Sequence, residues 1–440
     1  MDDLRDRLNR LLKQTAARAP GEPSGDGSPK HEGISLLRER LRRIGQLGAN
    51  GSAGAGAREA RKSRRSLEQV VPGRVVATPY GECLEIYEVY SLEYRHGRYS
   101  LCEVLEADFN TLDRICGGRG VGPAGPEEIL FMDLETTGLS LGTGTWVFLV
   151  GLGHFSGSQY HIRQFFLRNF AEEPALLYQV RKAMEPFRYL VTFNGKRFDV
   201  PLLEGRYALY RQSEGLPPMV SWDLLYPARR LWRGRLDDCR LETIEQGRLR
   251  VLRECSDIRG DRIPAAYLRY IHAGDAGDLE GVVYHNAMDV LTLASLALHV
   301  DRCLHAWNPA EVNLLSVGRY FEQKGSRQES GRCFEIVSNG GLSSEERESA
   351  SFHLARHRKR EGRIQEAIPH WEELIRRGSI FLPLCCEELA KHYEHTTGEL
   401  DKAIRVVETA LEALRLEDLR FRRRLLVRLS RLTRKKGQGL

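Results

Sequence analysis

Two acidic side chains close an apolar run in the segment "ILFMDLETTG", residues 129–138. The run predicts a buried strand, on which Asp133 and Glu135, two residues apart, would point to the same face. Neighbouring carboxylates repel each other and are costly to bury without compensation, so a cation is expected between them. Oxygen ligands of this kind suit Mg²⁺ or Mn²⁺ rather than zinc.

Two further carboxylates lie at positions from which the fold could bring them to the same place. Asp199 follows a predicted strand and opens a helix in "TFNGKRFDVPLL", and Asp289 lies on a long predicted helix in "YHNAMDVLTL". Four carboxylates can hold two divalent ions, which activate a water and stabilise the leaving oxygen in a displacement at phosphorus. His285 lies four residues before Asp289 on the same helical face, and an imidazole with a pKa near neutrality would serve as general base.

The segments "FMDLETTG", "NGKRFD" and "HNAMD", in this order, resemble the three motifs of the DEDD (DnaQ-like, RNase H-like) 3′–5′ exonucleases. With the segments on either side, the chain most resembles the YprB-like group of predicted exonucleases. The resemblance implies that Asp133, Glu135, Asp199 and Asp289 bind two Mg²⁺ or Mn²⁺ ions. It also implies 3′–5′ hydrolysis of single-stranded nucleic acid. The sequence does not decide between DNA and RNA, because the contacts that read a 2′-hydroxyl are few.

The sequence departs from the family pattern beside the last aspartate. One branch of the family has a histidine five residues before that aspartate, and the other has a tyrosine four residues before it. Here Tyr284 and His285 exchange these two residue types. A catalytically idle RNase H-like domain that only binds nucleic acid is therefore an alternative. A second alternative is an adaptor protein whose main role lies in the C-terminal helical repeats described below.

Several of these side chains also have a structural interpretation. Asp199 could simply cap its helix, and His285 could be a packed histidine. Asn194 either positions substrate or terminates a strand, and Phe198 either belongs to the core or stacks on a base. Asp223, in "SWDLL", is either an outer carboxylate of the site or a structural one. The remaining expected substrate contacts are backbone amides near the first strand, a wedging leucine and a tyrosine: Thr136, Thr137, Gly138, Leu139 and Tyr284.

The order of predicted elements indicates the fold around these residues. Three strand candidates joined by hairpins are followed by alternating helices and strands, so residues 128–303 are expected to form an α/β, ribonuclease H-like domain with a five-stranded mixed sheet and flanking helices. Residues 71–127 alternate apolar and polar positions and predict a small antiparallel β unit. Residues 304–440 predict a helical domain.

An internal period marks the helical domain. Its segments align on Gly325, Gly362 and Gly398, with Ala367 and Ala403 at the same offset from the last two glycines. The spacing resembles that of tetratricopeptide repeats, which bind protein partners on a concave face. The last segment, 415–440, holds ten Arg and Lys against one Asp and one Glu, and is either a polyanion-binding surface or a solvated helix face.

Composition limits the remaining choices. The chain has 440 residues, a formal net charge of +6 and 41% hydrophobic residues, with no apolar run near the ~20 residues that span a membrane. Nine cysteines without a CxxC pair predict reduced thiols and a cytoplasmic protein. Residues 1–70 are basic and rich in Gly and Ser. They predict two short helices, around 2–14 and 35–45, between flexible linkers.

Overall fold

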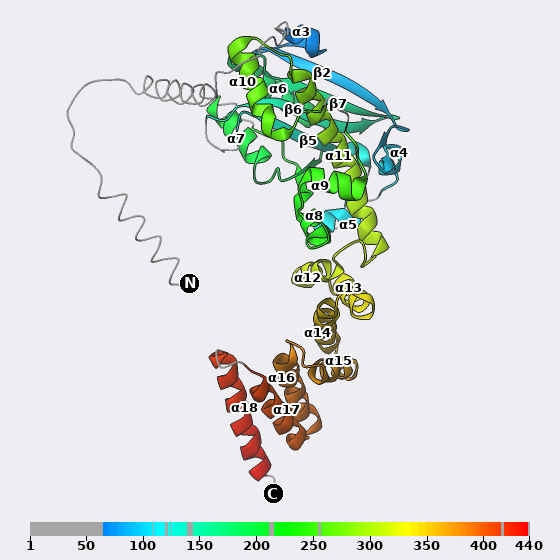
Figure 1. Cartoon of the computed structure of the whole chain (residues 1–440), viewed down its shortest axis with the longest axis vertical. Helices are drawn as coiled ribbons and strands as arrows, with labels where there is room; N and C mark the ends of the chain where they lie inside the picture. Colours follow the sequence, from blue (N-terminus) through cyan, green and yellow to red (C-terminus); the bar gives the residue numbers. More distant parts are fainter. Residues whose placement is uncertain are drawn as a thin grey trace, which may run out of the picture. The chain divides into compact units, whose positions relative to one another are not determined.

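The strand that carries Asp133 and Glu135 lies within a seven-stranded mixed sheet of order β1-β2-β7-β6-β5-β8-β9 (Figure 1). This computed structural model describes residues 65–107, 109–118, 122–123, 125–138, 144–210, 215–253, 257–414 and 418–438. The strands are β1 (Arg74–Thr78), β2 (Gly81–Ser91), β5 (Ile129–Thr136), β6 (Val147–Ser156), β7 (Gln159–Phe166), β8 (Tyr189–Thr192) and β9 (Val220–Asp223). The two short helices predicted around 2–14 and 35–45 lie outside the described residues.

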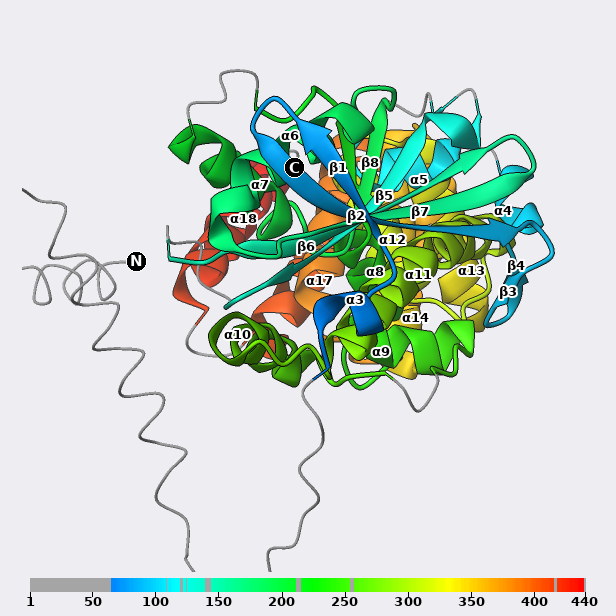
Figure 2. The ribbon, with the colours of Figure 1, turned by 90° about the horizontal axis from the view of Figure 1, so that it is seen from above.

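The sheet is larger than the five strands expected from sequence. Strands β5, β6 and β7 form the predicted antiparallel meander, and β8 and β9 add in parallel on the other side of β5. The difference lies in residues 71–127, because residues 84–91 of β2 pair antiparallel with the whole length of β7 and β1 pairs with β2. Figure 2 shows these two strands, in blue, continuing the sheet. Residues 71–127 are therefore not a separate β unit. Only the short hairpin of β3 (Arg95–His96) and β4 (Tyr99–Ser100) stands outside the main sheet among the described strands.

Alternation along β5 separates the two faces of the sheet. Ile129 and Phe131 join a core cluster with the long helix α11 (Leu279–Ala306), whereas Leu130 and Met132 join a second cluster with α6 (Glu173–Met184). Since side chains alternate along a strand, Asp133 and Glu135 continue the row that faces α11. The prediction that both carboxylates share one face is confirmed.

Two glycines of β6 allow α11 to approach the sheet closely. A Cβ atom at Gly151 would lie 2.2 Å from the amide oxygen of Asn286, and one at Gly153 would lie 2.4 Å from a methyl group of Val290. Gly151 is the direct neighbour of Asp133 across the β5–β6 ladder. The alternating glycines in "LVGLGHF" therefore set the distance between α11 and the carboxylate row.

Shorter helices connect the strands and surround this core. They are α3 (Leu67–Val70), α4 (Cys102–Leu105), α5 (Asn110–Ile115), α7 (Asp199–Leu209), α8 (Leu225–Trp232), α9 (Leu241–Ile244) and α10 (Ile263–Ala273). A π-helical turn, η3 (Glu245–Leu249), follows α9 directly. Such turns occur frequently at functional sites.

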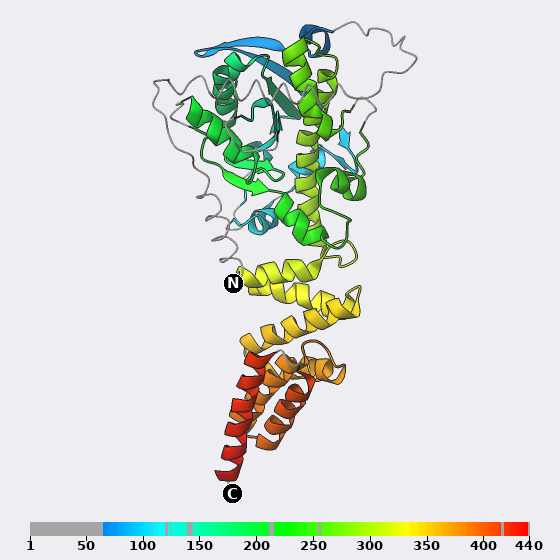
Figure 3. The same ribbon diagram turned by 60° about the vertical axis from the view of Figure 1, so that its left-hand side comes forward.

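The C-terminal helices pack one after another, as the sequence period predicts (Figure 3). Gly325, Gly362 and Gly398 all adopt positive φ values, between 73° and 81°, at the turns of three helix hairpins. This is the left-handed conformation for which glycine is the favoured residue. The helices are α12 (Leu314–Gln323), α13 (Arg327–Gly340), α14 (Ser344–Arg360), α15 (Ile364–Arg376), α16 (Leu382–His392), α17 (Leu400–Ala413) and α18 (Leu419–Gln438).

Helix α11 is long and apolar enough to cross a membrane by length and composition, although its sequence holds no uninterrupted apolar run near that length. Of its most apolar window, however, 78% is buried inside the protein. Its apolar character is explained by the sheet that it covers, since a helix that is apolar all round is also found in protein cores.

We expect Gly153→Ala to lower the free energy of unfolding by about 1–3 kcal/mol, because the added methyl group would clash with the Tyr160 hydroxyl of β7 and with Val290 of α11. Thermal and urea melts of the whole chain measure the change. Gly205→Ala is the matched control, since Gly205 is an exposed residue of α7 with open space around it. The control should be neutral or stabilise by up to about 1 kcal/mol. Equal effects of the two substitutions would contradict the close approach.

Candidate active site

The first pair of carboxylates lies on β5 beneath α11. Asn286, which is fully buried on α11, donates from Nδ2 to the Asp133 carboxylate at 2.9 Å and to the Asp133 carbonyl oxygen at 3.2 Å. The Asn286 amide oxygen accepts in turn from Gln164 on β7 at 2.9 Å. These bonds fix Asp133 against the helix that carries Asp289.

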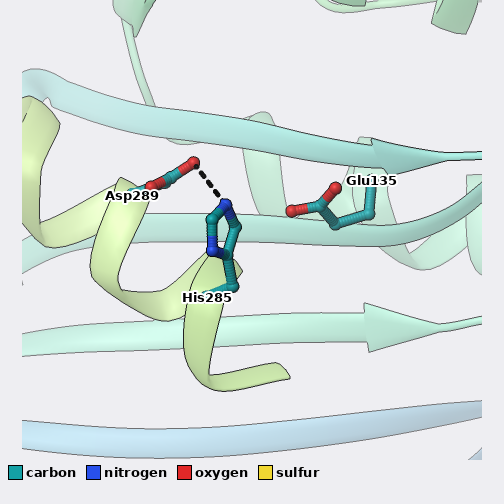
Figure 4. A group of neighbouring side chains, drawn as sticks. All are labelled: Glu135, His285 and Asp289. Atoms are coloured by element: carbon teal, nitrogen blue, oxygen red, sulfur yellow. Dashed lines mark ion pairs between the residues drawn. The ribbon is translucent and has the colours of Figure 1, made fainter. Parts of the chain in front are cut away.

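Helix α11 adds its own polar residues to the same place. Ligand atoms of Glu135, His285 and Asp289 all lie within 4.8 Å of one another (Figure 4). The Nε2 atom of His285 lies 3.6 Å from the Asp289 carboxylate, as the predicted spacing of four residues on a helix implies. Figure 4 shows the imidazole lying between the two carboxylates.

Asp199 is the first residue of α7, directly after the turn that follows β8. Among the described residues, no side-chain bond caps this helix, whose N-cap position is held by Phe198, so the capping interpretation of Asp199 is not supported. Burial, followed by the charge of Asp223, raises the pKa of Asp199 to about 7. The charge of Asp199 in turn raises the pKa values of Asp133 and Glu135. All four predicted carboxylates therefore share one electrostatic environment.

Burial and mutual repulsion dominate this environment. Burial first, and then the charges of Asp289, Glu135 and Asp199, hold the pKa of Asp133 well above its ordinary range. Burial also raises the pKa of Glu135 to about 8, although His285 and Arg253 oppose the shift. Half-buried carboxylates with raised pKa values mark positions where a cation would be strongly favoured.

The pKa of His285 differs from the near-neutral value that was expected. Burial disfavours the charged imidazolium, but the hydrogen bond to Asp257 and the charges of Asp289 and Glu135 outweigh it and raise the pKa to about 9. The Asp257 carboxylate lies 2.8 Å from Nδ1. At neutral pH and without bound metal, His285 is therefore an imidazolium and cannot accept a proton.

A guanidinium that the sequence did not predict lies at the same site. Arg253 hydrogen-bonds the carboxylate of Asp289, binds Glu245 at 2.6 Å and lies 3.4 Å from Asp257. Its Nη1 atom lies 3.2 Å from Nδ1 of His285. Arg253, Asp257, His285 and Asp289 are each only 15–18% exposed, so these charges interact with little screening by solvent.

A chain of buried hydrogen bonds holds the Arg253 guanidinium in place. Glu245, on the π-helical turn η3, is 2% exposed and also accepts a bond of 2.5 Å from the Thr292 hydroxyl on α11. That hydroxyl lies 2.7 Å from Nε2 of His96 on β3. Burial lowers the pKa of His96 to about 4, so this imidazole is neutral. Because the Thr292 hydroxyl donates its proton to Glu245, it can only accept from Nε2 of His96. The β3–β4 hairpin thus supports the site, a role that the sequence did not reveal.

The expected substrate contacts after β5 are only partly available. The Thr137 amide donates to the Trp146 carbonyl at 3.0 Å and its hydroxyl accepts from the Trp146 amide, so Thr137 closes the β5–β6 connection. The Thr136 hydroxyl donates to the carbonyl of Gly138. A Cβ atom built at Gly138 would meet no other atom of the described residues within 4 Å. The predicted wedge, Leu139, lies outside the described residues.

The other predicted contacts divide between structural and open positions. Asn194 adopts φ 67°, and its backbone N–H donates to the Asp223 carboxylate at 2.7 Å, so both residues shape the turn after β8. Phe198 is half-buried and joins none of the described core clusters. Tyr284 instead packs against the core cluster of α11.

The residues present fit a divalent metal. Among the described residues, no Lys or Arg forms an ion pair with Asp133, Glu135 or Asp199, although burial raises the pKa of all three carboxylates. Carboxylate oxygens are the ligands that Mg²⁺ and Mn²⁺ prefer. Asn286, Arg253, Asp257 and Glu245 were missed in the sequence. Asn286 could have been found from its place in "HNAMD", whereas the loop that holds Arg253 and Asp257 has no pattern.

We expect Asp133→Asn to raise the melting temperature of the metal-free chain at about pH 8. In the folded state Glu135 and Asp199 keep their protons up to about pH 8 and pH 7, whereas in the unfolded chain both ionise near their ordinary values. The folded state therefore binds more protons over this window, and stability falls as pH rises through it. Removing the Asp133 charge relieves this repulsion, and the gain should shrink at about pH 5, where the repulsion is absent.

Mn²⁺ should raise the melting temperature of the wild type by a few degrees at about pH 8 and leave that of Asp133→Asn nearly unchanged. Asp261→Asn, an exposed substitution on η4 (Gly260–Arg262), is the control. A variant at Asp133 that melts lower than the wild type without metal would contradict the electrostatic account.

Comparison with known proteins agrees with this geometry. The RNase H superfamily pattern matches residues 130–300, the segment that runs from β5 to α11, which confirms the expected ribonuclease H-like fold. A Bacillus subtilis protein, the uncharacterized protein YprB, is 32% identical over 362 residues, which cover 80% of this chain and 86% of that protein. The chain therefore belongs to the same family as YprB, with an RNase H superfamily domain that indicates a nucleic-acid hydrolase.

Proposed function

We propose that this protein is a metal-dependent 3′–5′ exonuclease that hydrolyses phosphodiester bonds at single-stranded DNA or RNA ends. The observation that carries the proposal is the group of Glu135, His285 and Asp289, whose ligand atoms lie within 4.8 Å of one another. Beside it, burial and the charges of Asp289, Glu135 and Asp199 raise the pKa of Asp133. The RNase H superfamily domain supports hydrolysis of nucleic acid. The 3′–5′ direction comes from the resemblance of the three motifs to the DEDD exonucleases.

Each side chain has a role in this proposal. Asp133, Glu135, Asp199 and Asp289 would hold two Mg²⁺ or Mn²⁺ ions, which when bound would activate a water and stabilise the leaving oxygen. His285 would accept the proton of that water. Positive charge bound among the neighbouring carboxylates favours the neutral imidazole, since it cancels the fields that now raise the His285 pKa. Asp257, bonded to Nδ1, would keep Nε2 directed toward Asp289 and Glu135.

The C-terminal helices would serve a partner or the nucleic acid. We propose that α12–α17 are tetratricopeptide-like hairpins that bind a protein segment. For α18 the charge pattern favours nucleic acid. Buried Glu394 forms ion pairs with Arg428, Arg431 and Lys435, which compensate part of the positive charge of α18. Three exposed arginines of α18 have no carboxylate partner among the described residues: Arg420, Arg423 and Arg434.

One observation favours the idle alternative. Arg253 already hydrogen-bonds Asp289, and His285 is positively charged without metal, so part of the carboxylate charge is compensated by the protein itself. A purely structural ion-pair network would have this property. The activity assay decides between the two functions.

With Mn²⁺ or Mg²⁺, the wild type should shorten a 5′-labelled single-stranded oligonucleotide stepwise from its 3′ end. Asp133→Asn should reduce the rate at least about 1,000-fold, since the metals supply several kcal/mol of transition-state stabilisation. Gel analysis of DNA and RNA substrates measures the rate and the polarity. Chelator should abolish cleavage, and Asp261→Asn should cleave like the wild type.

Internal cuts, or shortening from the 5′ end, would contradict the proposed direction. A wild type that binds the oligonucleotide but never cleaves it with either metal would favour the idle alternative.

Substituting Gln for the three unpartnered arginines of α18 should weaken binding of single-stranded nucleic acid. The slope of log K against log salt should fall by about 2, because each phosphate that an arginine neutralises contributes about 0.7 on a single strand. Fluorescence anisotropy over a salt series measures both quantities. The matched control removes the same charge from paired arginines at the two ends of α15: Arg363, Arg376 and Arg377. Equal effects in both variants would mean that only net charge matters.

A further inference from the structure

The face of the sheet that points away from the carboxylates carries a row of rings. Tyr87 of β2, His161 of β7 and His154 of β6 lie on three neighbouring strands, and His154 is the direct partner of His161 across the β6–β7 ladder. The Tyr87 and His161 rings are stacked with their centroids 5.8 Å apart, and those of His161 and His154 are stacked at 5.3 Å. Because His154 lies an odd number of residues from Gly151, the partner of Asp133, this ring row lies on the opposite face of the sheet from Asp133.

The ring row is open to solvent at its β2 end. Tyr87 is 51% exposed, and Val89, which follows it on the same face of β2, is 42% exposed. The Tyr87 hydroxyl lies 2.5 Å from Nδ1 of His161, and Nε2 of His161 lies 3.3 Å from the carbonyl oxygen of Ser156, so both rings are held in place. The exposed part of the Tyr87 ring is therefore a fixed aromatic surface that can stack on another ring.

Two guanidinium groups lie beside this ring. Buried Glu85 accepts from Arg163 at 2.7 Å with one oxygen and from Arg74 at 2.9 Å with the other. Two arginines against a single carboxylate leave one net positive charge, and the Arg74 side chain is 73% exposed. Together with the ring row, these groups line a hollow of about 510 Å³, which lies within the usual range for small-ligand sites.

We propose that this hollow is a further nucleic-acid site, which binds a nucleotide of a single strand outside the active site. A base would stack on the exposed Tyr87 ring, and a neighbouring phosphate would bind Arg74 or Arg163. An aromatic ring beside arginines suits single-stranded nucleic acid, because every base has a face that can stack and the phosphates require positive charge. Since the hollow lies on the opposite face from the carboxylates, it would hold a part of the strand remote from the cleaved end. The inference goes beyond the proposed hydrolysis, because binding here needs neither metal nor cleavage.

A purely structural role for the ring row would give a different result. Cross-strand pairs of rings stabilise a sheet by themselves. If Tyr87 served only this purpose, Tyr87→Leu would lower the melting temperature of the chain and leave its affinity for nucleic acid unchanged. If Tyr87 stacks on a base, the same substitution weakens binding, whereas Tyr87→Phe, which keeps the ring and loses only the hydroxyl, preserves it.

Fluorescence anisotropy of labelled oligo(dT) and oligo(U), with the full chain in chelator, tests the inference without cleavage. Tyr87→Leu should weaken binding of at least one of the two probes by at least about fivefold, the lower limit for loss of one base–aromatic stack. Tyr87→Phe should remain within about twofold of the wild type, since the stacking surface is kept. Tyr226→Leu, at another exposed tyrosine on α8, is the matched control and should bind like the wild type.

Photo-crosslinking of the wild type locates the site directly and does not depend on the folding of a variant. A single strand that carries iodouracil should crosslink, in chelator, to a peptide of β2 that contains Tyr87, as identified by mass spectrometry of the digested chain. Crosslinks confined to α18 or to the carboxylate cluster, unchanged affinity of Tyr87→Leu, or equal weakening by Tyr87→Phe would each overturn the inference. A wild-type dimer that Tyr87→Leu dissociates would also overturn it, because this face would then join two copies of the chain. Absence of nuclease activity would leave these results unaffected, since neither measurement requires cleavage.

Discussion

The site depends on the cost of holding several carboxylates close together away from water. Asp133 and Glu135 extend from β5, which is largely buried, and α7 and α11 bring Asp199 and Asp289 into the same electrostatic field. A folded chain that keeps such a group loses stability to it unless a cation compensates the charge. The arrangement is therefore difficult to explain as a device for stability and is readily explained as a binding site for cations.

The rest of the domain meets the geometric requirements of this cluster. The glycines of β6 let α11 lie close enough for Asn286 to bond Asp133, and the parallel addition of β8 to β5 delivers the start of α7 to the same edge. Both features concern the backbone. A bulky side chain at the β6 glycines would hold α11 away from the sheet, and a different strand order would place the start of α7 elsewhere. The apolar length of α11 follows from its burial on the sheet.

Support also comes from the β3–β4 hairpin, which lies outside the superfamily segment. The β3–β4 hairpin reaches the site through His96, Thr292 and Glu245, and the π-helical turn presents Glu245 to Arg253. The chain thus combines an acidic centre with a positively charged network of its own.

The sequence by itself determined the elements and the acidic residues. The apolar run before Asp133, the period-two spacing to Glu135 and the four-residue step from His285 to Asp289 are local patterns, and local geometry decides which face each side chain takes. The glycine period likewise predicted the helix hairpins. Only the tertiary structure decided that β1 and β2 extend the same sheet, that Arg253 lies on Asp289 and that the His285 pKa is raised. These features depend on contacts between residues far apart in the chain and on shared burial, which no spacing in the sequence encodes.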